Sequence, residues 1–334
     1  MVFNLSLSNI SKYRTELMGY AMIGVLIGHI IDLGHCEKTD LVSVLYWLCI
    51  LIHTNGFLML SGFGLFYSLS KDNNILRFYK RRFFRFLFPF LLMAIPYFFV
   101  VTLNKEENIW YYLSCISTIE FWLHGNYYGM WYIAISLILY ILTPLCFRLV
   151  ANYKCRSLGI MIFIIAAISL NLIIAWLLPN YWDKVKIGLT GVPYFFTGLW
   201  MASLVKGSRD YTFLVISVSI LIYFFLLMFD FMPFISGIVS IIVFSLLFST
   251  FFSLLSLNRV MQNINSFVAW FGKYSLELYI LHLYFWFIIK EVFNMGANWN
   301  IAIACLLSMV CCVPMHYITV KVSNLIQRRF CCVD

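Results

Sequence analysis

The chain has 334 residues, of which 63% are hydrophobic and 11% are charged, and its mean hydropathy is +0.91. A water-soluble globular protein would be about half apolar and a quarter charged, so the composition excludes that class and indicates an integral membrane protein. The net charge of +9 follows from membrane topology and does not argue for nucleic-acid binding. The ten cysteines lack CxxC or Cys/His ligand spacing, so we expect no metal site.

Long apolar runs, separated by short charged segments, recur along the chain at the roughly 18–25 residues that a spanning helix needs. They are apolar on all faces, whereas barrel strands would alternate. The predicted fold is therefore an all-α, polytopic membrane helix bundle, forming a single transmembrane domain over residues 1–334 with no separate soluble domain. The ten predicted spans are 17–34, 43–69, 84–103, 130–150, 157–178, 188–205, 211–228, 231–255, 270–290 and 299–322.

Basic residues are divided unevenly between the two sides of this bundle. The connections after odd-numbered spans carry only Lys38, Lys105, Lys184 and Lys186, with Lys290 at a helix edge, while the other 18 of the 23 Lys and Arg residues fall on the opposite side. Because cytoplasmic loops retain positive charge, we expect both termini in the cytoplasm and a multi-pass protein of the cytoplasmic (inner) membrane. We expect no removable signal peptide, so the first span is the targeting signal.

The first span carries a histidine, His29, about 18 Å from its cytoplasmic end at 1.5 Å per residue, which is near the membrane midplane. A titratable ring is costly in hydrocarbon and indicates a functional site. Asp32 follows at i+3 on the same helical face, where a carboxylate can orient the imidazole for general-base work. The alternative is an interior histidine bonded to a neighbouring helix, with Asp32 emerging at the outer interface.

The second span places His53 at a similar depth. Structural hydrogen bonding and substrate contact are both open roles for this side chain. Ser61, Gly62, Phe63 and Gly64 follow as a small-residue notch. Such a notch lets another helix, or an acyl chain, approach the backbone closely.

An arginine-rich loop, 70–85, follows the second span and contains the segment FYKRRFFRF. Arg82 and Arg85 are spaced i,i+3, so two planar guanidinium groups can face one way, a geometry suited to phosphate oxygens. Arg81 lies beside them. A nucleotide-bearing cytosolic donor fits this cluster, and anchoring to anionic lipid heads by positive charge is the alternative.

Two further groups of polar and aromatic residues stand out later in the chain. Trp131 and Tyr132 begin the fourth span, where aromatic rings either form the usual interfacial belt or stack on sugar faces. In the ninth span, Ser275, Tyr279 and His282 are spaced i, i+4 and i+7, which predicts one inward-facing polar stripe.

Six segments in this order resemble the acyltransferase-3 family of ten-helix membrane acyltransferases. They are ELMGYAMIGVLIGH, HTNGFLMLSGF, FYKRRFFRFLFPFLL, MWYIAISLILYILTP, GVPYFFTGLWMA and FGKYSLELYILH. The resemblance spans nearly the whole chain. It implies that His29 corresponds to the essential histidine that ends the family's first helix.

The resemblance implies transfer of an acyl group, most often acetyl, from cytosolic acyl-CoA to a hydroxyl of a carbohydrate or lipid-linked surface glycan. Arg82 and Arg85, with Arg81 and Arg14, are then expected to hold the CoA phosphates. His29, oriented by Asp32 or by a partner from another span, either deprotonates the acceptor or is itself acylated first. The expected substrate contacts are His53, Ser61, Trp131, Tyr132, Tyr279 and His282.

The chain departs from the family at two positions. Family members commonly carry Arg or Lys eleven positions before the first-helix histidine, where this chain has Met18. Arg14, one helical turn earlier, is long enough to reach a similar place. Many relatives also carry a Glu in the fourth helix, where residues 133–136 are apolar or small.

Two other function classes remain open. The first is a transporter or flippase for a lipid-linked glycan precursor, whose buried polar residues would line a pathway. The second is a degenerate acyltransferase that acts as a scaffold, for which Met18 is the motivation.

Overall fold

The structure is a computed structural model that describes residues 5–33, 39–50, 52–125, 130–150, 156–206, 233–292 and 297–331, with five positions between 212 and 219. The described residues form helices and no strand, which confirms the predicted all-α class. Two short segments, η1 (Phe83–Leu87) and η2 (Ile288–Val292), are π-helical. The α-helices are α1 (Ser8–Lys12), α2 (Arg14–Leu33), α3 (Asp40–Ile50), α4 (His53–Lys71), α5 (Ile75–Arg82), α6 (Phe88–Asn104), α7 (Ile109–Ile116), α8 (Ile119–His124), α9 (Trp131–Leu149), α10 (Arg156–Leu177), α11 (Pro179–Leu189), α12 (Val192–Lys206), α14 (Pro233–Leu255), α15 (Arg259–Lys273), α16 (Ser275–Phe287) and α17 (Ala297–Cys331).

Eight helical segments of the described chain are long and apolar enough to cross a membrane. They correspond to the predicted spans one to six, eight and ten, so the polytopic bundle is confirmed. They are Arg14–Leu33, Asp40–Lys71, Ile75–Asn104, Trp131–Leu149, Arg156–Leu177, Pro179–Lys206, Gly237–Leu255 and Asn300–Ile326. The seventh predicted span, 211–228, lies largely outside the described residues.

The ninth predicted span, 270–290, differs from the structure because the helix breaks at Tyr274. α15 ends just before this residue and α16 begins just after it, so the first part of the span belongs to a separate helix. α15 starts at a local signal, since the Asn258 side chain caps it by accepting a 2.9 Å hydrogen bond from the Val260 N–H. Hydropathy alone does not report such a break.

Two connections predicted as loops also contain helices. The predicted loop 104–129 contains α7 and α8, and α7 is capped by Asn108, which accepts a 3.0 Å bond from the Tyr111 N–H. The predicted loop 179–187 is covered by α11, which has Pro179 in its first turn. α7 and α8 are too short to span a membrane, whereas α11 forms the first part of the candidate span Pro179–Lys206.

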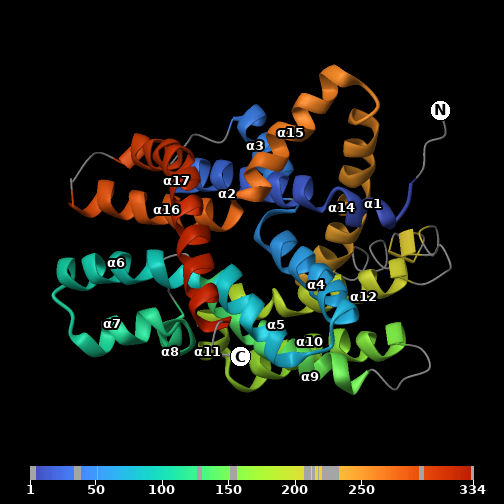
Figure 1. The fold of residues 1–334 in the computed structure, drawn as a ribbon, viewed down its shortest axis with the longest axis horizontal. Coiled ribbons are helices and arrows are strands. Elements are labelled where there is room, and N and C mark those ends of the chain that lie inside the picture. Colours follow the sequence, from blue (N-terminus) through green and yellow to red (C-terminus); the bar gives the residue numbers. More distant parts are fainter. Residues whose placement is uncertain are drawn as a thin grey trace.

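Glycines bring the central helices into close contact. A Cβ added at Gly62 of α4 would lie 2.1 Å from the Phe195 carbonyl oxygen, and one at Gly198 of α12 would lie 1.9 Å from that of Met59. The small-residue notch of the second span therefore serves helix packing at Gly62. Figure 1 shows α4 beside α12, and α16 beside α17.

Candidate active site

The site is centred on two histidines from distant parts of the chain, His29 of α2 and His282 of α16. His282 Nε2 lies 3.0 Å from His29 Nδ1, and His282 Nδ1 lies 2.8 Å from the Leu278 carbonyl oxygen. His282 is fully buried, while His29 is half-buried. His282, the last residue of the polar stripe predicted on the ninth span, therefore contacts His29.

These two bonds determine which nitrogens carry protons when both rings are neutral. The Leu278 carbonyl can only accept, so His282 Nδ1 is protonated and donates to it. His282 Nε2 is then bare and accepts from His29 Nδ1–H. His29 Nε2 is consequently left with a free lone pair, which is the form that a general base requires.

A cavity of about 570 Å³, which we call the histidine cavity, contains His29 in its wall. It lies toward the end of the bundle formed by α8 and α11, the end predicted to be extracytoplasmic. Its lining mixes aromatic, charged and hydroxyl groups, among them Thr54, His124, Trp131, Asp183, Lys184 and Lys186.

A second cavity, the arginine cavity, of about 230 Å³, opens toward the end that holds the loop after α4. Its lining includes Arg14, Met18, Ser61, Arg82, Arg85, Tyr132 and Tyr279. A third, the α17 cavity, of about 350 Å³, adjoins it and is lined by Arg81 and by Arg85, which the two share.

Tyr279 connects the two sides, because it lines both the histidine cavity and the arginine cavity. This side chain is 3% exposed, and its ring centroid lies 5.9 Å from that of His282. At this point, beside the histidine pair, the side chain of Tyr279 separates the two cavities.

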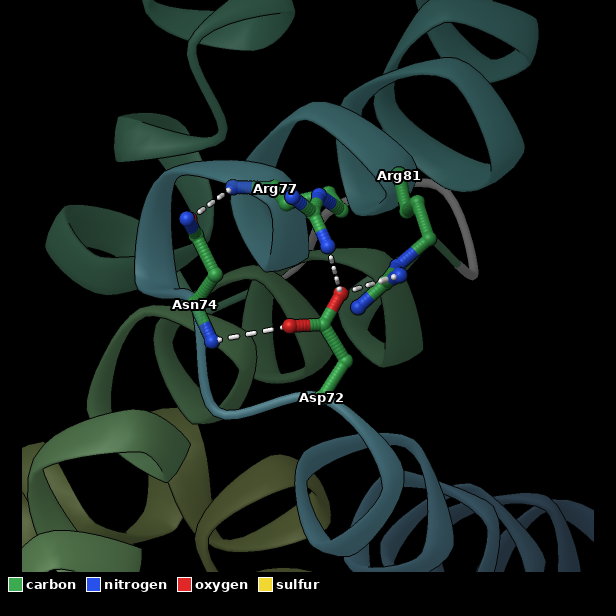
Figure 2. Close-up of polar contacts among 4 residues, drawn as sticks. All are labelled: Asp72, Asn74, Arg77 and Arg81. Atoms are coloured by element: carbon green, nitrogen blue, oxygen red, sulfur yellow. Dashed lines mark hydrogen bonds and ion pairs between the residues drawn. The ribbon is translucent and has the colours of Figure 1, made fainter.

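Arg81, one of the four arginines predicted to bind the donor, is held together with Arg77 by an aspartate in the loop after α4. Asp72 Oδ2 accepts 3.0 Å bonds from Nη1 of both Arg77 and Arg81, and its Oδ1 accepts from the Asn74 backbone N–H (Figure 2). That N–H, with Arg81 and Arg77, holds the pKa of the Asp72 carboxyl below its usual value. The pairing is therefore retained at neutral pH and lost only in acid, as the carboxyl protonates.

Arg82 and Arg85 are not paired with Asp72 in the described part of the chain, and both line the arginine cavity. Arg82 lies over the rings of Phe78 and Tyr140, at 5.6 and 5.8 Å from their centroids. Arg85 is carried by the π-helical segment η1, a local distortion that is frequent at functional sites. Among the described residues, Arg82 Nε and two nitrogens of Arg81, Nε and Nη2, are buried without a hydrogen-bond partner.

Arg14 reaches the same cavity as Met18, the position where the family carries a basic residue. Its Nε donates to the Leu60 carbonyl oxygen at 3.0 Å. Its guanidinium lies against Gly64, where an added Cβ would come within 2.6 Å of Nη2. The second glycine of the notch thus makes room for Arg14.

The other predicted residues are distributed around these cavities. Asp32 is exposed and accepts a 3.0 Å bond from the Tyr46 hydroxyl, and no hydrogen bond or ion pair joins it to His29 among the described residues. His53 Nδ1 is buried without a partner in the described part of the chain. Ser61 lies 3.4 Å from the hydroxyls of Tyr132 and Tyr140.

One partly buried pair was not foreseen from the sequence. Glu277 of α16 accepts a 2.7 Å bond from His316 Nδ1 of α17, and both residues line the arginine and α17 cavities. The signal available in the sequence was the presence of a carboxylate within an apolar span. Among the described residues, no group of three or more His, Cys, Asp and Glu side chains is placed to hold a metal ion.

The structure is thus a multi-pass helix bundle with a histidine pair beside two polar interior cavities. The acyltransferase-3 family model, described as an acyltransferase domain, matches residues 19–317. The chain therefore belongs to this family and is a membrane acyltransferase. Neither the curated proteins nor the solved structures gave a match.

Proposed function

We propose that the protein transfers an acetyl group from acetyl-CoA, on the cytoplasmic side of the inner membrane, to a hydroxyl of a surface carbohydrate or lipid-linked glycan. The observation that carries the proposal is the meeting of the arginine cavity and the histidine cavity at Tyr279. A donor in the arginine cavity and an acceptor in the histidine cavity then both extend to Tyr279, beside the histidine pair. No metal takes part in the proposed chemistry.

The donor side of the proposal is supported by arginine side chains that have no ion-pair partner among the described carboxylates. Arg14, Arg82 and Arg85 line one cavity, and none of the three forms an ion pair with a described carboxylate. Buried guanidinium N–H groups without partners are costly, and phosphate oxygens satisfy them. The CoA phosphates are the proposed ligands, with the thioester extending toward Tyr279.

The acceptor side is supported by the lining of the histidine cavity. Trp131 offers an apolar face for a sugar ring, while Thr54, Asp183 and Lys184 offer polar contacts to hydroxyl groups. The acceptor hydroxyl lies at His29 Nε2 in this arrangement. Membrane lipids surround the bundle and hold the carrier of a lipid-linked acceptor.

The proposed reaction balances without another reactant. His29 Nε2 takes the hydroxyl proton, the acceptor oxygen bonds to the thioester carbon, and the carbon–sulfur bond breaks. The CoA thiolate then receives the proton from the imidazolium. His282 accepts from His29 Nδ1–H throughout and stabilises the positive ring. A route through an acylated His29 uses the same free nitrogen.

Arg85→Ala should raise the KM for acetyl-CoA by roughly tenfold or more, because a charged hydrogen bond to phosphate is lost. The measurement is donor titration with purified protein. Arg77→Ala is the matched control, since Arg77 is paired with Asp72 and lines none of the described cavities. An unchanged KM in Arg85→Ala, or an equal rise in the control, would count against the phosphate role.

Gly64→Ala should raise the same KM several-fold while leaving the fold intact, because the new methyl meets the flexible end of Arg14 and displaces it. Gly28→Ala is the control, since its added Cβ meets nothing within 4 Å. Equal donor KM values in the two variants would show that Arg14 does not contact the donor.

Mass spectrometry of surface glycans, with and without the protein, tests the reaction as a whole. The proposal predicts that one acetyl group per modified sugar disappears when the protein is absent. Identical glycan masses would contradict it, and a loss of succinyl would correct the acyl group.

A further inference from the structure

The pair formed by Glu277 and His316 occupies the junction of the arginine cavity and the α17 cavity. Glu277 Oε1 lies 2.7 Å from His316 Nδ1, and the two side chains are 6% and 32% exposed. Both cavities also share Arg85. A ligand that extends from Arg81 in one cavity to Tyr279 in the other must therefore pass Glu277.

In the described part of the chain, Glu277 forms no ion pair with the arginines around it. Arg14, Arg82, Arg85 and Lys273 all line the arginine cavity, yet the one ion-pair partner of Glu277 among the described residues is His316. His316 occupies Oε1, so Oε2 is left as an acceptor in the cavity wall. A carboxylate buried at 6% exposure requires partners for its lone pairs, and a ligand can supply one.

The negative charge of the Glu277 carboxylate limits which ligand groups it can contact. A carboxylate repels phosphate and accepts hydrogen bonds from N–H groups, and the N–H groups of an acyl-CoA donor are uncharged at neutral pH. Along α16, Glu277 precedes Tyr279 by about 3 Å of helix rise, so it lies on the approach to the histidine pair. A donor whose phosphates contact the arginines and whose carbonyl reaches Tyr279 would pass Glu277 with the segment between those two groups.

We propose that Glu277, held by His316, is a specificity residue that accepts a hydrogen bond from a secondary amide N–H in the uncharged arm of the acyl thioester donor. This inference rests on the proposed function. The arginines fix the charged end of the donor, and Glu277 fixes the arm, so that the thioester is presented at Tyr279. Recognition of an amide arm selects pantetheine-type thioesters over simple ones.

The test compares Glu277→Leu with Glu277→Gln in the purified full-length protein, with thiol release from acetyl-CoA as the assay. Leucine removes the acceptor, so the KM for acetyl-CoA should rise roughly tenfold or more with kcat nearly unchanged. Glutamine keeps a carbonyl acceptor, so its KM should stay within a few-fold of the native value. Glu291→Leu, an exposed glutamate in η2 paired with Lys290, is the control.

A shortened donor identifies which N–H is bound. S-acetyl-4′-phosphopantetheine has the amide arm but lacks the adenine amine. The KM penalty of Glu277→Leu should be the same with this donor as with acetyl-CoA. A penalty that vanishes with it would assign the contact to adenine and overturn the amide assignment.

The remaining outcomes separate this inference from the proposed function. A native protein that releases thiol from neither donor contradicts the proposed function itself. A native protein that is active, beside a Glu277→Leu variant whose KM is unchanged or lower, overturns the inference alone. A loss confined to kcat in both Glu277 variants would assign Glu277 a structural role and also overturn it.

Discussion

His29→Ala should lower acyl transfer by roughly a hundred- to ten-thousandfold, the usual contribution of a general base, while the amount of protein in the membrane stays normal. The reason is that His29 lines the histidine cavity, and that the bond from its Nδ1–H to His282 leaves the lone pair on Nε2 available to take a proton. The measurement is the transfer rate with saturating donor, set against the amount of folded protein.

His29→Asn is the more demanding variant of the same test. Its side-chain amide still donates to His282 Nε2, so the local packing and hydrogen bond are retained while the base is lost. It should be as inactive as the alanine variant. Near-native transfer by the asparagine variant would remove His29 from the chemistry.

His282→Leu should lower kcat by roughly a hundredfold with little change in either KM. Without an acceptor at this position, nothing holds the proton on His29 Nδ1, and the ring loses the tautomer in which Nε2 is free. In the Ser-His-Asp proteases, an equivalent loss of tautomer control has a large effect on kcat.

His282→Gln is the matched control because its amide oxygen can accept from His29 Nδ1–H. It should recover a measurable part of the rate that leucine loses. Steady-state kinetics of the two variants give the comparison. If both variants lose the same rate, the role of His282 is packing and not control of the His29 tautomer.

The fold was predictable to the extent that membrane insertion depends on apolar length. Runs such as 157–178 carry that signal in every residue, and the structure has α10 there. The break at Tyr274 was not visible, because it depends on a capped helix, α15, packing against α2 through Gly19 and Gly272. Hydropathy records how apolar a segment is and not whether its helix is continuous.

The site was predictable where chemistry is local in sequence. Arg82 and Arg85 lie close in the chain, and both line the arginine cavity as their spacing suggested. The partner of His29 was not predictable, since His282 lies 253 residues away and helix spacing favoured Asp32. Asp32 instead lies at the exposed end of α2, where Tyr46 donates to it.

The two alternative functions, a transporter and a scaffold, predict different behaviour of the same residues. A transporter for a lipid-linked glycan would use the buried histidines as part of a pathway and would leave acetyl-CoA intact. A scaffold would bind partners and release no thiol. Only an enzyme with the proposed mechanism makes a new ester that depends on His29.

The most direct measurement follows a labelled acyl group through the purified protein in lipid nanodiscs, with ¹³C-acetyl-CoA and a lipid-linked glycan extract from the host. The account predicts a labelled acetyl ester on the glycan and an equal amount of free CoA, both absent with His29→Ala. A native protein that is folded and binds the glycan, yet forms neither product, would contradict it.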